Sequence, residues 1–177
     1  PDWFIKKDGE NWKCGGNWSG FYSLDIDVPE AEAYIRKVFD QVINDWGYDL
    51  VKLDFLYGAA PFGSETETRS ARMYRAVRLL REICGDKPIL GCGVPVMPAF
   101  GIVDYCRISC DVSLDEDDQW FMHFFHRERV STTNAITNIY TRNQLNRHAY
   151  MSDPDVFFLR SDNIKLSEEQ KSQLAQL

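Results

Sequence analysis

Residues 48–57 read Tyr48-Asp-Leu-Val-Lys-Leu-Asp-Phe-Leu-Tyr57, an apolar and partly β-branched run with two charges inside it. Gly47 and Gly58 flank the run, and this pattern predicts a buried strand. Because side chains alternate along a strand, Lys52 and Asp54 are expected to share one face near its carboxyl end. Parallel α/β folds bind ligands at that end. The run therefore predicts a ligand site, with a structural ion pair between these two residues as the alternative.

Composition limits the class of protein. The 177 residues, 44% of them hydrophobic, are enough for one domain with a real core. The net charge of -7 and the pI near 5.0 argue against a nucleic acid or an anionic membrane as partner. No apolar run approaches the roughly 20 residues that a membrane helix needs, and the start, Pro1-Asp2-Trp3-Phe4, does not resemble a signal peptide. The missing initiator Met suggests a segment cut from a longer chain.

The five cysteines cannot all pair within one chain, and none shows the C-x-x-C spacing of a zinc site. Three of them, Cys84, Cys92 and Cys106, lie in or beside apolar runs, where a free thiol packs as a small hydrophobe. These features predict a reducing compartment and a cytoplasmic protein.

Strands are expected to alternate with helices along the chain. The five expected strands cover residues 21–27, 48–57, 88–93, 105–111 and 149–159. Alternation of this kind predicts the α/β class with a parallel sheet and right-handed crossovers. The expected architecture is a set of β/α units from a TIM-type (β/α)8 barrel, with about five of its eight strands present.

Helix signals fit this order. Asp27 and Glu30 have capping-box spacing around Pro29, and Ser167 with Gln170 is expected to begin the last helix. One helix carries an arginine at every third position, which we interpret as a solvated face. These arginines are Arg69, Arg72, Arg75, Arg78 and Arg81.

Acidic residues recur where the expected strands end, at Asp54, Asp111, Asp153 and Asp155. Arg107 and Asp111 are expected to share a strand face. Two carboxylates on separate strands, each with a cation on its own strand, suit glycoside hydrolysis, in which one attacks the anomeric carbon and the other protonates the leaving oxygen.

Two other groups have open interpretations. The acidic run Asp115-Glu-Asp-Asp118 fits a helix N-terminus or, alternatively, a metal site. The tryptophans of the first loop, Trp3, Trp12 and Trp18, are expected either to stack on sugar faces or simply to pack.

The order of several motifs resembles glycoside hydrolase family 36, the melibiase-type α-galactosidases, over almost the whole chain. The motifs are Pro1-Asp-Trp-Phe4, Asn17-Trp18, Tyr22-Ser-Leu-Asp25, Lys52-Leu-Asp54, Gly91-Cys-Gly-Val-Pro95, Arg107-Ile-Ser-Cys-Asp111, Asn134-Ala-Ile136 and Ser152-Asp-Pro-Asp155. In the last motif Ser152 stands where the family usually has Asn, which puts a side-chain amide contact there in doubt.

The resemblance implies roles for individual residues. Asp54 is implied as the nucleophile and Asp111 as the acid/base, which must carry a proton at the start of the cycle. Substrate contacts are implied for the remaining site residues, which are Trp18, Lys52, Cys92, Gly93, Arg107 and Asp153. The implied reaction is hydrolysis of terminal α-linked galactose with retained configuration, without a metal or a cofactor.

Residues 1–177 are expected to form a partial catalytic (β/α)8 barrel, central to late in the barrel, without its N-terminal strands and its last strand. Such a partial barrel has open edges, so we expect it to be inactive alone and to form a homo-oligomer that covers those edges. Two alternatives remain: an α-N-acetylgalactosaminidase or other α-glycosidase of the same clan, and a non-catalytic barrel segment.

Overall fold

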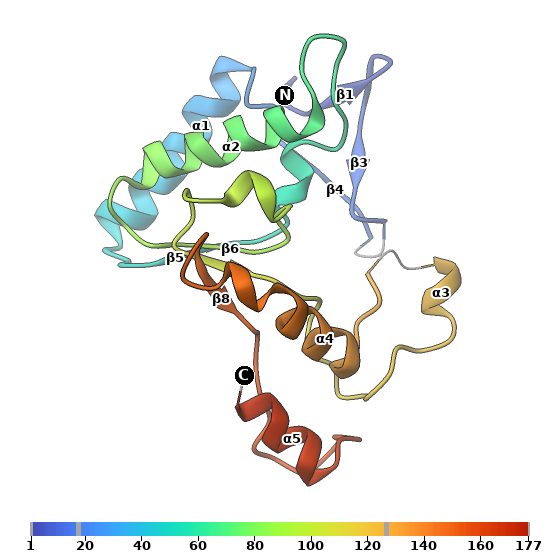
Figure 1. Ribbon diagram of the computed structural model, residues 1–177. Coiled ribbons are helices and arrows are strands. Elements are labelled where there is room, and N and C mark those ends of the chain that lie inside the picture. Colours follow the sequence, from blue (N-terminus) through green and yellow to red (C-terminus); the bar gives the residue numbers. More distant parts are fainter. Residues whose placement is uncertain (1, 17–18, 126–127, 177) are drawn as a thin grey trace. The chain divides into compact units, whose positions relative to one another are not determined.

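The computed structural model describes residues 2–16, 19–125 and 128–176 (Figure 1). The chain divides into two compact units, Pro1–Cys106 and Arg107–Leu177. The strands are β1 (Lys6–Lys7), β2 (Glu10–Asn11), β3 (Lys13–Cys14), β4 (Phe21–Tyr22), β5 (Val51–Leu53), β6 (Ile89–Gly91), β7 (Tyr105–Arg107) and β8 (Met151–Asp153). The α-helices are α1 (Pro29–Asp40), α2 (Arg69–Cys84), α3 (Met122–Phe125), α4 (Thr132–Arg142) and α5 (Glu168–Ala175).

The main sheet is parallel, with the strand order β5-β6-β7-β8. Val51 lies opposite Ile89, and Leu90 lies opposite Tyr105. Helix α2 forms the crossover from β5 to β6, whereas a loop with one 3₁₀ turn, Met97–Ala99, connects β6 to β7. The predicted class is confirmed: these are parallel β/α units of the kind that build a TIM barrel.

The strand predicted for residues 21–27 is shorter than expected and does not belong to the parallel sheet. Only Phe21–Tyr22 is extended within a ladder, and it pairs antiparallel with β3. A single bridge joins Phe4 to Leu24, and the Ile5 N–H donates to the Ser23 carbonyl at 3.0 Å. The alternating pattern was therefore read correctly as extended backbone, but its partners are the preceding antiparallel segments.

Helix α1 begins one residue later than its expected cap. Val28 occupies the N-cap, without a side-chain hydrogen bond, and Pro29 follows at the first helical position. A π-helical turn over Gln41–Asp45 continues α1, and Gly47, with φ +72°, lies beyond its end as predicted. Asp27 is thus free of a capping role, which corrects the predicted capping box.

The arginines of α2 are a solvated face only in part, because Arg69, Arg75 and Arg78 are exposed but Arg72 and Arg81 are half-buried. Arg72 pairs with Asp25 at 2.7 Å and with Asp27 at 2.6 Å, and its side chain is only 16% exposed. Arg75 also pairs with Asp27, and its hydrogen bond, helped by the charge of Arg72, lowers the pKa of that carboxyl. Arg81 donates to the Ile102 carbonyl at 2.9 Å. Arg72, Arg75 and Arg81 therefore join α2 to the segments that pack around it.

The core of the first unit lies between its helices and strands. Helix α2 begins at its cap Thr68, whose hydroxyl accepts from the Ala71 N–H at 3.2 Å. Helices α1 and α2 lie on one side of β5 and β6 (Figure 1), and Arg36 on α1 pairs with Glu82 on α2 at 2.7 Å. The buried side chains of α2 follow its helical period and are Met73, Ala76, Val77 and Cys84.

The second unit has a small core of its own. Its buried apolar members are Val112, Ala135, Leu166 and Leu174. Helix α4 is capped by Ser131, whose hydroxyl accepts from the Asn134 N–H at 3.0 Å. The capping box predicted for Ser167 and Gln170 is confirmed at the start of α5, with both reciprocal hydrogen bonds present.

Among the residues that the structure describes, no helix has the length and the apolar character needed to cross a bilayer.

Candidate active site

Lys52 and Asp54 lie at the carboxyl end of β5, where the sequence placed them. Both side chains are exposed, and no ion pair joins these two described residues. The structural ion pair is therefore not formed. The expected burial of the strand is only partly correct: Val51 is buried, but Leu50 is 44% exposed. Among the described residues β5 is an edge strand of the main sheet and has a neighbouring strand on one side only, β6.

The backbone immediately after Asp54 is held in an unusual conformation. Phe55 has φ +55°, a left-handed value that costs free energy for a residue with a side chain. Its N–H donates to the Asp54 carboxylate at 2.7 Å. This bond holds one oxygen of the Asp54 carboxylate against the backbone of the next residue, while the Asp54 side chain stays exposed. Strained turns of this kind concentrate at functional sites.

The turn after β6 packs directly against the Asp54 turn. The Cys92 N–H donates to the Leu53 carbonyl at 2.8 Å, and the Tyr57 N–H donates to the Gly93 carbonyl at 2.8 Å. Gly93 has φ +57°, and a Cβ there would lie 3.1 Å from the Phe55 nitrogen and 3.4 Å from an Asp54 carboxylate oxygen. Only glycine suits both constraints. Gly93 is thus a neighbour of Asp54, whereas the Cys92 side chain is buried.

An aromatic cluster that the sequence reasoning missed lies beside Asp54. The ring of Phe21 on β4 lies 5.4 Å from that of Phe55 and 5.9 Å from that of Tyr57. Gly15 and Gly58 both approach the Phe21 ring too closely to carry a Cβ. The available signal was the run Asp54-Phe-Leu-Tyr57, which sets two aromatic residues just after the carboxylate. Trp18, which was predicted to contact substrate, lies outside the described residues.

In the second unit, Arg107 holds two carboxylates. Its Nη2 lies 2.7 Å from an Asp111 oxygen and 2.7 Å from an Asp155 oxygen. The Arg107 side chain is 4% exposed and that of Asp155 is 14% exposed, whereas Asp111 is 53% exposed. The pairing of Arg107 with Asp111 is not explained by the shared strand face that was expected, because β7 ends at Arg107. Asp111 reaches Arg107 from the loop that follows the strand.

Asp155, which the predicted site set omitted, belongs to the same cluster of charges as Arg107 and Asp111. Besides Arg107, its carboxylate accepts from the Val112 N–H at 2.8 Å. Its own N–H donates to Asp153 at 3.0 Å, and its φ is +77°. Asp155 therefore fixes the backbone one residue after Asp111, and Asp153 shapes the turn that presents Asp155. The motif Ser152-Asp-Pro-Asp155 pointed to the right turn, but not to which carboxylate pairs with Arg107.

Arg107→Met should destabilise the protein by about 3 to 5 kcal/mol, because it leaves the mostly buried Asp155 carboxylate without its cation. Urea unfolding, with the midpoint and slope both measured, checks this. Arg160→Met is the control, since Arg160 is 52% exposed and only 4.0 Å from Asp162. A loss for the Arg107 variant no larger than that of the control would contradict the buried bridge.

The acidic run 115–118 does not begin a helix of its own, but it lies at a helix N-terminus: the Asp115 and Glu116 carbonyls accept from the Thr132 and Thr133 N–H groups that begin α4, at 3.3 and 2.9 Å. Asp115 pairs with Lys165 at 2.6 Å, and Asp118 lies 3.3 Å from Arg129 and 3.4 Å from His123. Within the described part of the chain, no group of three or more potential ligands could hold a metal ion.

A groove of about 680 Å³ is lined by residues of α1 and α2, among them Arg36, Arg75 and Arg78, and by Ile26, Gly101 and Ile102. It contains none of the predicted site residues. Arg36 and Arg75 are paired with carboxylates, so the groove is better explained as a helix-helix packing surface than as the reaction site.

No protein-family model matches the sequence. Among solved structures, the chain is similar to TtGalA, an α-galactosidase from Thermus thermophilus, in its complex with stachyose. The two share 30% identity with a TM-score of 0.84, over 99% of this chain and 38% of that one.

The chain is a relative of the family 36 α-galactosidases. A second TtGalA structure, with p-nitrophenyl α-D-galactopyranoside, agrees: 30% identity and a TM-score of 0.83 over 98% of this chain and 36% of the other. The chain thus spans somewhat more than a third of these Thermus chains. The predicted resemblance is confirmed at the level of family and fold, while the roles of individual residues stay predictions.

Proposed function

We propose that the chain supplies part of the active site of a retaining glycoside hydrolase that removes terminal α-linked galactose. The observation that carries this proposal is where the two candidate carboxylates lie. Asp54 follows the end of β5 by one residue, and Asp111 lies in the loop after β7. These are the strand ends at which barrel enzymes hold their catalytic groups. The likeness to an α-galactosidase over 99% of the chain supports the substrate class.

The proposed reaction proceeds in two displacements. In the first, a carboxylate oxygen of Asp54 forms a bond to the anomeric carbon while the glycosidic bond breaks, and Asp111 gives its proton to the leaving oxygen. In the second, Asp111 takes a proton from water, whose oxygen attacks the same carbon and releases Asp54. Two inversions give retained configuration. The mechanism needs the two carboxyl groups about 5 to 5.5 Å apart in the assembled barrel.

The remaining residues would position these groups and the sugar. The exposed Lys52 ammonium, near Asp54, can donate to galactose hydroxyls. Gly93 lets the β6 turn approach Asp54 closely, and its turn holds the strained Phe55 backbone. Arg107 and Asp155 hold Asp111, and Asp153 shapes their turn. We keep Cys92 and Trp18 as proposed contacts of the sugar.

Hydrolysis of p-nitrophenyl α-galactoside by an intact enzyme that contains this chain tests the proposal. Proton NMR during the first minutes should show the α anomer of galactose appearing before mutarotation. Appearance of the β anomer first would overturn retention, and turnover of p-nitrophenyl α-N-acetylgalactosaminide alone would move the proposal to that sugar.

The 177-residue chain, purified alone, should show no turnover of the nitrophenyl galactoside. Its described parallel sheet has four strands, whereas closure of this barrel needs eight. Near the β5 edge, Trp46 is 62% exposed and Tyr48 is 57% exposed. We propose that copies of the isolated chain associate through this edge, as unpaired edge strands do. Light scattering coupled to gel filtration, alongside the assay, checks both statements; a monomer with steady turnover would contradict them.

A further inference from the structure

The second unit carries exposed aromatic side chains on a loop that follows Asp111. Trp120 and Phe124 are each 74% exposed, and Phe121 is 38% exposed. The Trp120 ring lies 6.4 Å from the Phe121 ring and 6.2 Å from the Phe124 ring, in edge-on arrangements. Full burial of one large aromatic residue removes about 150 to 250 Å² from water. Other large apolar side chains of the chain are as exposed, but these three also contact one another, and a contiguous exposed apolar patch is typical of a binding surface.

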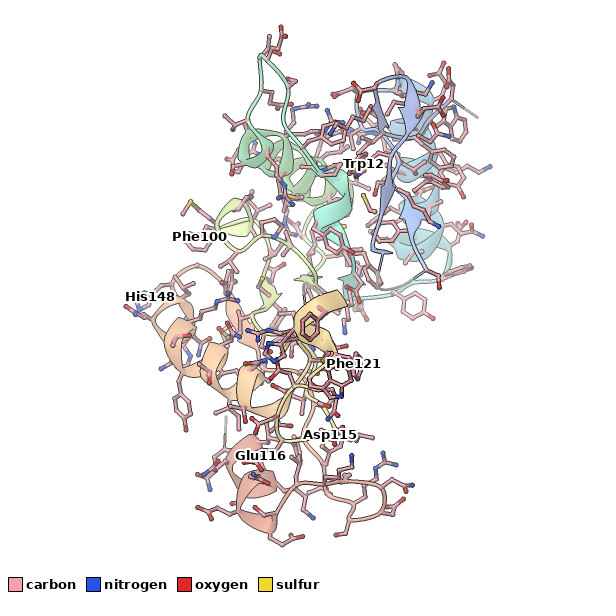
Figure 2. The ribbon with its side chains drawn as sticks, turned by 90° about the vertical axis from the view of Figure 1, so that its right-hand side faces the viewer. Trp12, Phe100, Asp115, Glu116, Phe121 and His148 are labelled. Atoms are coloured by element: carbon pink, nitrogen blue, oxygen red, sulfur yellow. The ribbon has the colours of Figure 1, made fainter. Side chains whose placement is uncertain are left out.

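The chain on both sides of these rings is firmly attached to the rest of the unit. Before them, the Asp115 and Glu116 carbonyls accept from the Thr132 and Thr133 N–H groups at 3.3 and 2.9 Å. The Leu114 carbonyl accepts from the Lys165 N–H at 2.9 Å. Figure 2 shows Asp115 and Glu116 in the segment that leads toward Phe121 and α3. The attachment sets the start of the loop against the N-terminus of α4.

A second attachment closes the loop at its base. Asp118 lies 3.3 Å from Arg129 Nη1, and the same nitrogen lies 3.0 Å from His123 Nδ1. The Asn134 side chain donates to the Arg129 carbonyl at 2.9 Å, which ties this end to α4 as well. Residues 118 and 129 are thus joined, and the rings project from the segment between them. We call Trp120, Phe121 and Phe124 the aromatic platform.

We propose that the aromatic platform binds the leaving-group sugar of an oligosaccharide α-galactoside. This inference rests on the proposed function, because it places the platform relative to Asp111. An acid/base residue touches the glycosidic oxygen, and in this proposal the loop that follows Asp111 therefore extends along the leaving-group side of the broken bond. Trp120 is nine residues further along the same unit. Aromatic faces pack against the C–H faces of pyranose rings, and exposed rings held on a fixed loop suit that contact.

The charge around the platform favours a neutral sugar over the other kinds of ligand that bind aromatic surfaces. The exposed acids Glu116 and Asp117 border the platform in sequence, and the whole chain carries a net charge of -7. Carboxylates accept hydrogen bonds from neutral sugar hydroxyls but repel anionic lipid headgroups and nucleic acid phosphates. The rim therefore favours a neutral, hydroxyl-rich ligand.

The test compares two substrates that differ only in the leaving group. The leaving group of stachyose is a trisaccharide, whereas that of α-galactosyl fluoride is a fluoride ion, which has no ring that could contact the platform. In an intact enzyme that contains this chain, Trp120→Ala should lower kcat/KM for stachyose about three- to tenfold and change it less than about twofold for the fluoride. Tyr140→Ala, which removes a ring that is 65% exposed on α4 and outside the platform, should leave both values unchanged.

The possible outcomes distinguish failure of the aromatic platform from failure of the proposed hydrolase function. An equal effect of Trp120→Ala on the two substrates would overturn the platform while leaving the hydrolase assignment intact. If the unaltered enzyme hydrolyses neither substrate, the proposed function fails, and the platform is then judged by binding alone. For that measurement the protein is labelled with 5-fluorotryptophan, and the ¹⁹F signal absent from Trp120→Phe is followed during titration with stachyose. A saturable shift supports the platform, and an unmoved signal overturns it.

Discussion

Asp54→Ala is expected to lower turnover of p-nitrophenyl α-galactoside by at least about 1,000-fold in an intact enzyme that contains this chain. The first displacement then has no group that can form the bond to the anomeric carbon. The structure gives this residue a special setting: its carboxylate is held by the Phe55 N–H at 2.7 Å and faces a turn at Gly93 that no larger residue could form. Removal of the side chain should leave a space beside the anomeric carbon without disturbing the strand.

Azide tests whether that space is the nucleophile's position. Added azide should restore part of the turnover of Asp54→Ala and give β-galactosyl azide, because a single displacement inverts the configuration. Asp49→Ala is the matched control, since Asp49 precedes the same strand and its side chain is 94% exposed and paired with Lys87. The control should retain activity within about twofold. Activity near the unaltered level in Asp54→Ala would end the assignment.

The residues that could be predicted best are those whose local chemistry leaves little choice. Gly47 and Gly93 both have positive φ, as expected of glycines that end a helix and form a tight turn. Ser167 and Gln170 form the predicted capping box. At these positions the local rule and the tertiary structure agree: the close approach of Gly93 to Phe55 also requires glycine.

Prediction failed where a distant partner determines the local structure. Asp27 has the spacing of a helix cap, yet it binds Arg72 and Arg75 of α2, and two guanidinium groups outweigh one backbone N–H. Phe55 has a left-handed backbone because the β6 turn is hydrogen-bonded across it. Asp155 pairs with Arg107 through a contact far apart in sequence. Periodicity and capping rules act over a few residues, so they contain no information about such pairs.

The same limit applies to the candidate site. The carboxylates Asp54 and Asp111 could be selected because both follow expected strand ends, and Arg107 could be selected because it precedes Asp111 on a strand. The aromatic neighbours Phe21 and Tyr57 could not, because an aromatic residue after a carboxylate is equally typical of a packed core. An aromatic residue of the core can be distinguished from one beside the candidate site only when the structure shows which rings lie together.

Asp111→Ala is expected to lower kcat/KM for stachyose about 100- to 10,000-fold and to affect p-nitrophenyl α-galactoside far less. A sugar alkoxide is a poor leaving group that needs a proton, whereas nitrophenolate leaves readily without one. The ratio kcat/KM reports the first displacement, so the comparison isolates the acid role of Asp111 from its later role as a base. The fold should tolerate the change, because Arg107 keeps Asp155 as its partner at 2.7 Å.

The stereochemistry of azide products separates Asp111 from Asp54. In Asp111→Ala the Asp54 ester still forms, so azide attacks that intermediate and should give α-galactosyl azide, with configuration retained through two inversions. Asp162→Ala removes a carboxylate that is 72% exposed and lies outside the aromatic platform, so this variant should behave as the unaltered enzyme on both substrates. Equal losses on stachyose and on the nitrophenyl substrate would make Asp111 a structural partner of Arg107. Formation of the β azide would show that its carboxylate occupies the nucleophile's side of the sugar, and the two roles would have to be exchanged.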